Sequence, residues 1–177
     1  MRTLARGLLV TMFLLASASP ASAHGVGGRQ PTDVHVRVTE VEPAVAGVSV
    51  NVVEFGSKLE LVNASDAEVI VLGYAGEPYL RVGPEGVFEN RRSPAAFINR
   101  TLDPPSTVPD SYDSDAAPLW RQLGSGISVR WHDHRAHNMT GGNPSTPIAW
   151  AVDLTVGGEP VVVRGDIATV AAPAWWP

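Results

Sequence analysis

The sequence predicts an all-β fold, an immunoglobulin-like or cupredoxin-like sandwich of about eight or nine strands with one long proline-rich loop. From Asp33 onward, short runs rich in valine, leucine and isoleucine alternate with glycine, proline, asparagine and aspartate, which is the pattern of strands separated by turns. No segment after Asp33 has the apolar period of a good amphipathic helix. Strands at this regular spacing are typical of a sandwich.

The first half of the domain contains the most regular strand patterns. In VHVRVTEV, residues 34–41, valines alternate with polar side chains, so we expect a half-buried strand with His35 facing outward. EPYLRVGPEGVFEN, residues 77–90, is expected to form two short strands around a turn at residues 83–86. Between these segments, apolar runs separated by turn residues predict three further strands at 48–55, 58–63 and 68–74.

Residues 91–126 interrupt this pattern. The segment RRSPAAFINRTLDPPSTVPDSYDSDAAPLWRQLGSG holds five prolines and little periodicity, so we interpret it as a long loop and not as a strand. A loop of this length in a compact domain is usually functional or packs as an ordered cover. Within it, SPAAFINRTL and PLWRQL are each expected to form a short helical turn.

Three strands follow the long loop and complete the predicted sandwich. They are expected at residues 127–134, 148–156 and 160–170, with the last two joined as a hairpin at Gly157-Gly158. Alternation along the first of these strands predicts two faces. The face directed to the core holds Ile127, Val129 and Trp131, and the other holds Arg130, His132 and His134.

The first 23 residues have the pattern of a secretory signal peptide. A basic start at Arg2 and Arg6 precedes an apolar run at residues 8–15, and Ala21-Ser22-Ala23 forms an A-x-A-like cleavage site. The apolar run is too short to span a bilayer, and no other stretch of the sequence predicts a transmembrane helix. We therefore expect an exported protein, extracellular or at the cell surface. Its expected parts are the signal peptide (1–23), a flexible N-terminal tail (24–32), a single β-sandwich domain (33–171) and a C-terminal tail (172–177).

Composition narrows the classes of function. The chain has a net charge of −5 at pH 7, and removal of a signal peptide with two arginines would make it more acidic, which argues against a nucleic-acid partner. Cysteine is absent, so disulfides and thiolate ligands are excluded, and any metal must be held by nitrogen, oxygen or thioether sulfur. No nucleophile elbow, phosphate loop or dinucleotide fingerprint occurs, so no motif argues for an enzyme.

The segment RWHDHRAHNM, residues 130–139, holds three of the five histidines and is the most distinctive candidate site. If a strand continues through it, His132 and His134 form a pair on one face, and His137 lies close enough in sequence to be a third metal ligand. Neutral imidazole suits copper and zinc. Cleavage before His24 would add a fourth partner, because an N-terminal histidine chelates Cu(II) through its α-amino and ring nitrogens.

The same residue types would also build a structural clasp. Arg130, Asp133 and Arg135 interleave with the histidines, and such a network could hold the long loop to the sheet without a metal. In a metal carrier the imidazole nitrogens would converge, whereas in a clasp the arginines would bind carboxylates and the histidines would bind backbone carbonyls. The sequence leaves both alternatives open. Residues 24–32, with three glycines, likewise have the composition of a disordered tail.

Two motifs carry a resemblance to a known family. VLGYAGEPYLRVGPEGVFENRRSPAAFINRT and RWHDHRAHNM, followed by a strand centred on tryptophan in IAWAVDL, resemble exported, usually membrane-anchored actinobacterial proteins over most of residues 33–177. The resemblance implies an extracytoplasmic β-rich domain and a C-terminal membrane helix, but no particular activity. The family usually has His-Trp-Met where this chain has His137-Asn138-Met139. Since the helix is missing here, APAWWP would be a juxtamembrane remnant in a truncated product, and the alternative is a soluble variant.

These observations lead to three hypotheses. The first is a non-enzymatic cell-envelope protein that binds copper or zinc through the three clustered histidines, with His24 as a fourth partner. The second is an envelope protein–protein interaction module in which the cluster is structural and the loop at 91–126 is the partner surface. The third is a metal-dependent hydrolase with Glu77 or Glu89 as the base.

Overall fold

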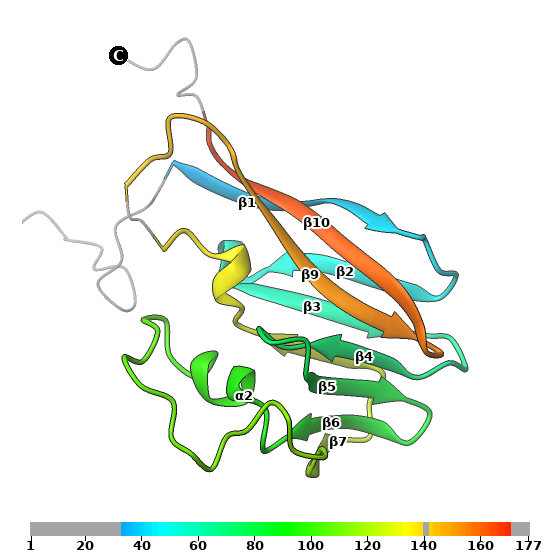
Figure 1. Ribbon diagram of the computed structural model, residues 1–177. Helices are drawn as coiled ribbons and strands as arrows, with labels where there is room; N and C mark the ends of the chain where they lie inside the picture. The colour runs from blue at the N-terminus through cyan, green and yellow to red at the C-terminus, as the bar shows by residue number, and fades with distance from the viewer. Residues whose placement is uncertain (1–32, 140–141, 171–177) are drawn as a thin grey trace, which may run out of the picture. The chain divides into compact units, whose positions relative to one another are not determined.

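The computed structural model describes residues 33–139 and 142–170 (Figure 1), which belong to the compact unit Thr32–Pro177. Within these residues the chain forms ten strands in two antiparallel sheets and one short α-helix. The predicted all-β sandwich is therefore confirmed. The predicted signal peptide, the N-terminal tail with His24 and the C-terminal tail lie outside the described residues.

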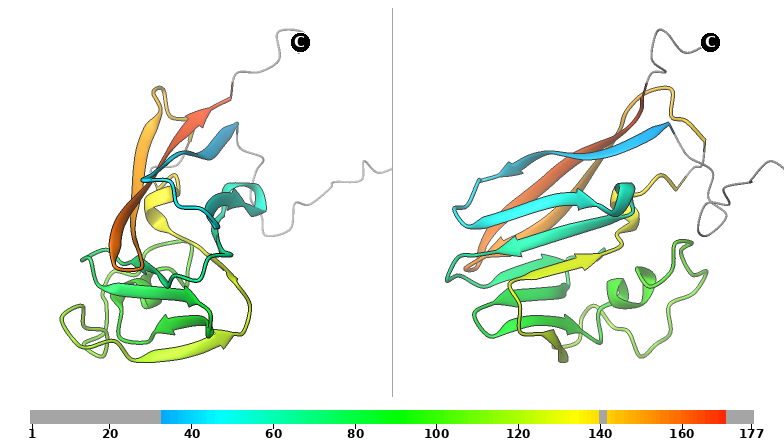
Figure 2. Two further views of the ribbon diagram at one scale, coloured as in Figure 1. Left: turned by 90° about the vertical axis from the view of Figure 1, so that its right-hand side faces the viewer. Right: turned by 180° about the vertical axis from the view of Figure 1, so that it is seen from behind.

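The larger sheet has seven strands, and β1 and β7 lie at its edges. In order across the sheet, the strands are β1 (Val34–Glu42), β10 (Glu159–Thr169), β9 (Ile148–Val156), β4 (Val69–Leu72), β5 (Pro78–Gly83), β6 (Gly86–Asn90) and β7 (Trp120–Gly124). The smaller sheet consists of β2 (Val48–Val53), β3 (Lys58–Asn63) and β8 (Ser128–Trp131), with β3 in the centre. Seen from behind, the smaller sheet lies in front of the larger one (Figure 2).

Alternating side chains of both sheets form the core. In β3 every second residue is buried, beginning with Leu59, and β9 and β10 alternate in the same way over most of their length. Each aliphatic side chain fully removed from water stabilises the fold by about 1.5–3 kcal/mol. The largest fully buried aliphatic side chains are Leu59, Leu61, Leu80, Leu154, Ile167, Val69, Val71, Val82, Val152, Val161 and Val163.

The hairpin between β9 and β10 turns where the sequence predicts. Gly157 and Gly158 have φ values of 59° and 90°, which a two-residue hairpin turn requires and which glycine adopts without strain. Along the same pair of strands, Gly165 lies opposite Trp150. A Cβ atom at position 165 would lie 2.1 Å from Cζ2 of Trp150 and 2.2 Å from the Arg37 carbonyl oxygen. Glycine at this position therefore makes room for the indole ring.

A strand interrupts the segment predicted as a loop at 91–126. β7 pairs with β6 from Asn90↔Trp120 to Val87↔Gly124, so the expectation of a helical turn in PLWRQL is wrong. This strand also raises the number above the expected eight or nine. β7 is an edge strand in which residues 121–124 are exposed, so no apolar alternation marks it in the sequence. Pairing with β6 decides its conformation.

The other helical turn predicted in this segment is confirmed. The helix α2 (Pro94–Ile98) is capped by Ser93, whose hydroxyl accepts a hydrogen bond from the backbone nitrogen of Ala95 over 3.2 Å. Pro94 occupies the start of the helix, where its missing N–H has no partner to lose. In the part of the chain that the structure describes, no helix has the length and apolar character needed to cross a membrane.

β8 ends at Trp131, three residues before the predicted end of this strand. Asp133 ends it, because its carboxylate accepts a hydrogen bond from the backbone nitrogen of Arg135 over 3.1 Å. This contact begins the 3-10 turn η2 (His134–Ala136). A short polar side chain that binds the backbone locally competes with strand pairing in this way.

The early end of β8 changes the predicted faces of this segment. Val129 and Trp131 are buried as predicted, but Ile127 is 52% exposed and does not belong to the core. His132 and His134, which were expected on the outward face, are both buried. The two histidines lie beyond the strand, so strand alternation does not determine their directions.

Candidate functional site

The histidine cluster lies at an end of the sandwich where three segments meet. These are the 3-10 turn η1 (Glu54–Gly56) between β2 and β3, the turn η2 after β8, and the long loop that carries α2. Figures 1 and 2 show all three at the end where β1 begins and β10 finishes. The strand predicted at 48–55 stops at Val53, where η1 begins.

His132 and His134 each bind the backbone of a different segment. His132 donates from Nδ1 to the Ser57 carbonyl oxygen over 2.9 Å, directly after η1. His134 donates from Nε2 to the Thr101 carbonyl oxygen over 2.8 Å, in the long loop. The two residues are only 8% and 9% exposed. Because a carbonyl oxygen only accepts, each of these two ring nitrogens carries a proton.

The structure brings the three clustered histidines together. The ring centroid of His132 lies 4.8 Å from that of His134 and 4.9 Å from that of His137, and both contacts are edge-on. Among residues 33–139 and 142–170, no three histidine, aspartate or glutamate side chains are grouped so that they could hold a metal ion. His24, the fourth predicted ligand, lies outside these residues.

Asp133 fixes the turn between the two histidines. Its buried carboxylate forms an ion pair with Arg135 over 2.8 Å and accepts a hydrogen bond from Nε1 of Trp131 over 2.9 Å. Arg135 also donates to the Leu72 carbonyl oxygen over 3.0 Å, which ties η2 to β4. Burial acts to lower the pKa of Arg135, but the ion pair with Asp133 outweighs it and the pKa is raised. Arg130 pairs with Glu60 over 2.7 Å.

Tyr74 connects the same turn to the long loop. Its hydroxyl donates to Oδ1 of Asn99 over 2.5 Å and accepts a hydrogen bond from the backbone nitrogen of His134 over 3.2 Å. The Arg135 guanidinium carbon lies 4.9 Å from the centre of the Tyr74 ring, a cation–π contact. Burial raises the pKa of Tyr74, so the hydroxyl keeps its proton and remains a donor at neutral pH.

The two carboxylates considered as catalytic bases have structural partners. Glu77 is buried and accepts hydrogen bonds from the Ser93 hydroxyl over 2.6 Å and from the Ala75 backbone nitrogen over 3.0 Å. It thereby holds the start of α2 against the β4–β5 turn. Glu89 forms an ion pair with Arg121 over 2.6 Å. Both carboxylates act as acceptors within the fold.

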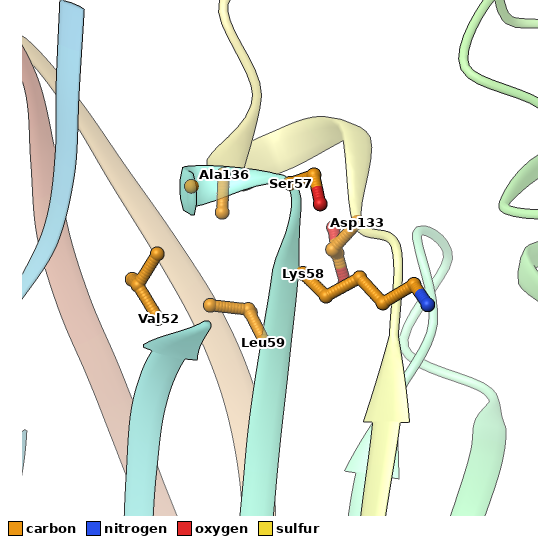
Figure 3. Close-up of a pocket in the computed structure, with 7 residues that line it drawn as sticks. Val52, Ser57, Lys58, Leu59, Asp133 and Ala136 are labelled. Atoms are coloured by element: carbon orange, nitrogen blue, oxygen red, sulfur yellow. The ribbon is translucent and has the colours of Figure 1, made fainter. Parts of the chain in front are cut away.

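Two hollows border the cluster. The larger is a cavity of about 310 Å³ whose lining includes His132, Trp131 and loop residues 99–102. The smaller, lined in part by Leu59 and Ala136, has no room for a water molecule. Figure 3 shows Ala136 next to η1 and above Leu59, while Lys58 extends away from the interior. Ala136 of η2 is therefore tightly packed against β3, while His132 borders the larger cavity.

The sequence locates the cluster but not its partners. Ser57, Tyr74 and Thr101 come from three separate segments, and no local motif connects them to the histidines. The interleaving of histidine with arginine and aspartate is the one signal of a clasp, and the contacts of Arg130 and Arg135 with carboxylates match that alternative.

Comparison with known proteins gives no identity for the chain. No protein-family model matches it, and no curated protein or solved structure shows significant similarity to it. The resemblance to exported actinobacterial proteins therefore stays a prediction.

Proposed function

We propose that this chain is an exported cell-envelope protein that binds a protein partner, and that the histidine cluster is a structural clasp. The clasp consists of His132, Asp133, His134 and Arg135 with the groups that they bind. The observation that carries the proposal is that the two histidines hold two different segments, the η1 turn and the long loop, through their ring N–H groups. These two segments form the proposed partner surface.

The segments joined by the clasp expose apolar side chains. Phe55 in η1 is fully exposed, and Leu102 in the long loop is 42% exposed. Tyr74 and Met139, next to the clasp, also expose more than a third of their surface. Single exposed apolar residues are common on any protein, but aromatic and methionine side chains are enriched at protein interfaces. Their position beside one rigid cluster supports a binding role for this end of the domain.

The backbone of η1 supports Phe55 as a contact residue. Glu54 and Phe55 have φ values of 51° and 56°, and such values in residues other than glycine cost about 1–3 kcal/mol each. Neighbouring contacts maintain the turn: the Ser57 hydroxyl donates to the Glu54 carbonyl oxygen over 2.8 Å, and Lys58 pairs with the Glu54 carboxylate over 2.9 Å. Strain of this kind is concentrated at functional sites.

Sequence features support export and a binding role. Residues 1–23 have the basic start, apolar run and small cleavage residues of a signal peptide. Glu77 and Glu89, the carboxylates that a hydrolase would need as bases, are engaged by Ser93 and Arg121. These features support an exported protein that binds a partner over one that catalyses hydrolysis.

Site-specific crosslinking tests the proposed surface. The exported protein would carry a photoreactive phenylalanine analogue at position 55, with Leu123 on β7, 47% exposed, as the matched control position. The proposal predicts a discrete adduct with one envelope protein from position 55 and none from position 123. The adduct should decrease when His132 and His134 are both replaced by alanine. Equal adducts from both positions, or none from position 55, would contradict the proposal.

Metal binding by the same histidines is the second candidate. The closeness of the three rings supports it, although the described side chains form no group of three that could hold a metal ion. Since Nδ1 of His132 and Nε2 of His134 donate to carbonyls, the opposite nitrogen of each ring is the one that could act as a metal ligand. Histidines that bind a metal through one ring nitrogen usually donate the N–H of the other nitrogen to a carbonyl or carboxylate group. Imidazole nitrogens suit copper or zinc. His24 would supply further nitrogens if cleavage makes it the N-terminus.

Titration of a chain that begins at His24 with Cu(II) and Zn(II) separates the two candidates. Calorimetry measures binding, and electron paramagnetic resonance reports the copper ligands. Metal binding predicts one tightly bound equivalent that is lost in the His132→Ala/His134→Ala variant and retained in His35→Ala, whose histidine is exposed on β1. The clasp predicts no stoichiometric binding and a large loss of thermal stability in the same double variant.

A further inference from the structure

The cavity beside the clasp has the properties of a ligand site. Its volume is about 310 Å³, at the lower end of the range for small-molecule pockets, roughly 300–1,000 Å³. Its wall combines the long loop, through Asn99, Arg100 and Leu102, with Lys58 of β3 and Arg130 of β8. We propose that it binds a small organic anion, a carboxylate or phosphate with a body about the size of a monosaccharide. The inference rests on the proposed function, because the clasp holds the loop that forms one wall.

Charge is the first argument for an anion. Lys58, Arg100 and Arg130 line the cavity, and Glu89 is the one acidic residue among the lining side chains. Lys58 pairs with Glu54 over 2.9 Å and Arg130 pairs with Glu60 over 2.7 Å, so carboxylates within the domain largely neutralise these two cations. The charge available to a ligand therefore comes mainly from Arg100.

Arg100 differs from the other two cations. In the part of the chain that the structure describes, no carboxylate pairs with it, and its guanidinium carbon lies 5.8 Å from the centre of the Tyr112 ring. A guanidinium group presents parallel N–H donors that match the oxygens of a carboxylate or phosphate. Arg100 is therefore the residue that we expect to bind the charged group of the ligand.

Asn99 supplies the second argument. It lines the cavity, is only 8% exposed, and its Oδ1 accepts the hydrogen bond from Tyr74 that fixes the orientation of the amide. Its Nδ2 is buried beside the Tyr79 hydroxyl and forms no well-aligned hydrogen bond among the described residues. A buried donor without an acceptor costs about 1–3 kcal/mol. An oxygen atom of a ligand next to Arg100 would supply the acceptor.

The remaining wall limits the size and polarity of the ligand. Tyr79 and Trp131 are buried rings that border the cavity, and Ala96 and Leu102 add apolar surface. Thr101 lies in the same wall; its hydroxyl donates to the Asp103 carbonyl oxygen over 2.7 Å and can still accept a hydrogen bond from a ligand hydroxyl. A compact anion with hydroxyl groups on an apolar ring fits this combination better than an inorganic ion alone.

Binding is tested by nuclear magnetic resonance titration of the exported domain with glucuronate and with glucose 1-phosphate. The proposal predicts saturable shifts of the amides of residues 96–102 and of the Trp131 indole with at least one of the two anions. Glucose, the neutral control, should bind at least about tenfold more weakly. The anion that binds more tightly distinguishes a carboxylate from a phosphate ligand. No shift with either anion, or equal binding of glucose, would overturn the proposal.

Matched variants identify the residues responsible. Arg100→Gln should weaken binding at least about tenfold, whereas Arg91→Gln, an exposed arginine of the same loop that does not line the cavity, should leave the affinity unchanged. Equal loss in both variants would overturn the role of Arg100. Amide hydrogen exchange of the long loop in the unliganded protein tests the clasp separately. If the loop amides are protected but no anion binds, the ligand proposal is wrong and the clasp proposal stands.

Discussion

His134 donates from Nε2 to the carbonyl oxygen of Thr101, a residue 33 positions earlier in the chain. The bond connects the turn after β8 with the long loop before β7. A loop of this length keeps much conformational entropy unless specific contacts hold it. Together with the Tyr74–Asn99 and Glu77–Ser93 contacts, the bond holds the loop in place, and with it the proposed partner surface.

Replacing His134 by alanine should destabilise the domain. The substitution removes the ring of a buried histidine and its bond to the carbonyl oxygen of the exposed Thr101, and a hydrogen bond of this kind contributes about 0.5–1.5 kcal/mol. The free energy of unfolding, measured by urea denaturation, should fall by this amount. His35→Ala, which changes an exposed histidine on β1, should leave it almost unchanged. Equal values for the two variants would contradict a structural role for His134.

Asp133→Ala should have a larger effect. It leaves the largely buried Arg135 without its carboxylate and Trp131 Nε1 without an acceptor, and breaking a buried ion pair in this way costs about 3–5 kcal/mol. The matched control is Asp166→Ala, which breaks an ion pair with Arg37 at the surface of β1 and β10. Thermal unfolding should show a much larger decrease for Asp133→Ala. Similar decreases would mean that the buried network contributes no more than a surface pair.

Gly165→Ala should disturb the packing of Trp150. The added methyl group would lie 2.1 Å from Cζ2 of the indole and 2.2 Å from a backbone oxygen, so the ring or the strand must move. Overpacking of this kind costs about 1–3 kcal/mol. Urea denaturation followed by tryptophan fluorescence measures the loss. Gly126→Ala, where the added carbon meets no heavy atom within 4 Å, should be close to neutral.

Alkaline pH should destabilise the domain through Tyr74 and Tyr79. Burial raises the pKa of both hydroxyls above the usual 10.0, so below that value both tyrosines are protonated in the folded and the unfolded chain. As the pH rises through 10.0, the unfolded chain loses these protons first, and the free energy of unfolding falls until the folded pKa is reached. Urea denaturation between about pH 9 and about pH 11 measures this slope. Tyr74→Phe should reduce the slope, and an unchanged slope would contradict the prediction.

Strand alternation and turn residues predict most of the sandwich, because burial of one face enforces a period of two. The β9–β10 hairpin and α2 follow from local signals, two adjacent glycines and a serine–proline cap. β7 has no such signal, since an exposed edge strand needs no apolar face and its pairing with β6 is a long-range contact. Sequence periodicity alone does not reveal strands of this kind.

The candidate site is likewise predicted from the sequence only in part. The cluster of His132, His134 and His137 is visible in the sequence, but its burial is not, because Asp133 ends β8 before the histidines. The partners of the histidines are backbone carbonyl groups, which carry no residue-type signal. Asn99 and Arg100, which line the cavity, lie in a loop whose position depends on those same contacts.

The central claim, that the histidine cluster is a clasp, is tested most directly by amide hydrogen exchange in metal-free protein. The measurement compares residues 91–119 in the wild type and in the His132→Ala/His134→Ala variant, with β9 and β10 as the internal reference. The clasp predicts that loop amides such as Asn99, which donates to the Ala95 carbonyl oxygen over 3.0 Å, exchange at least about tenfold faster in the variant while the reference strands stay protected. Equal exchange in both proteins, or a wild-type loop that becomes protected only when copper or zinc is added, would contradict the claim.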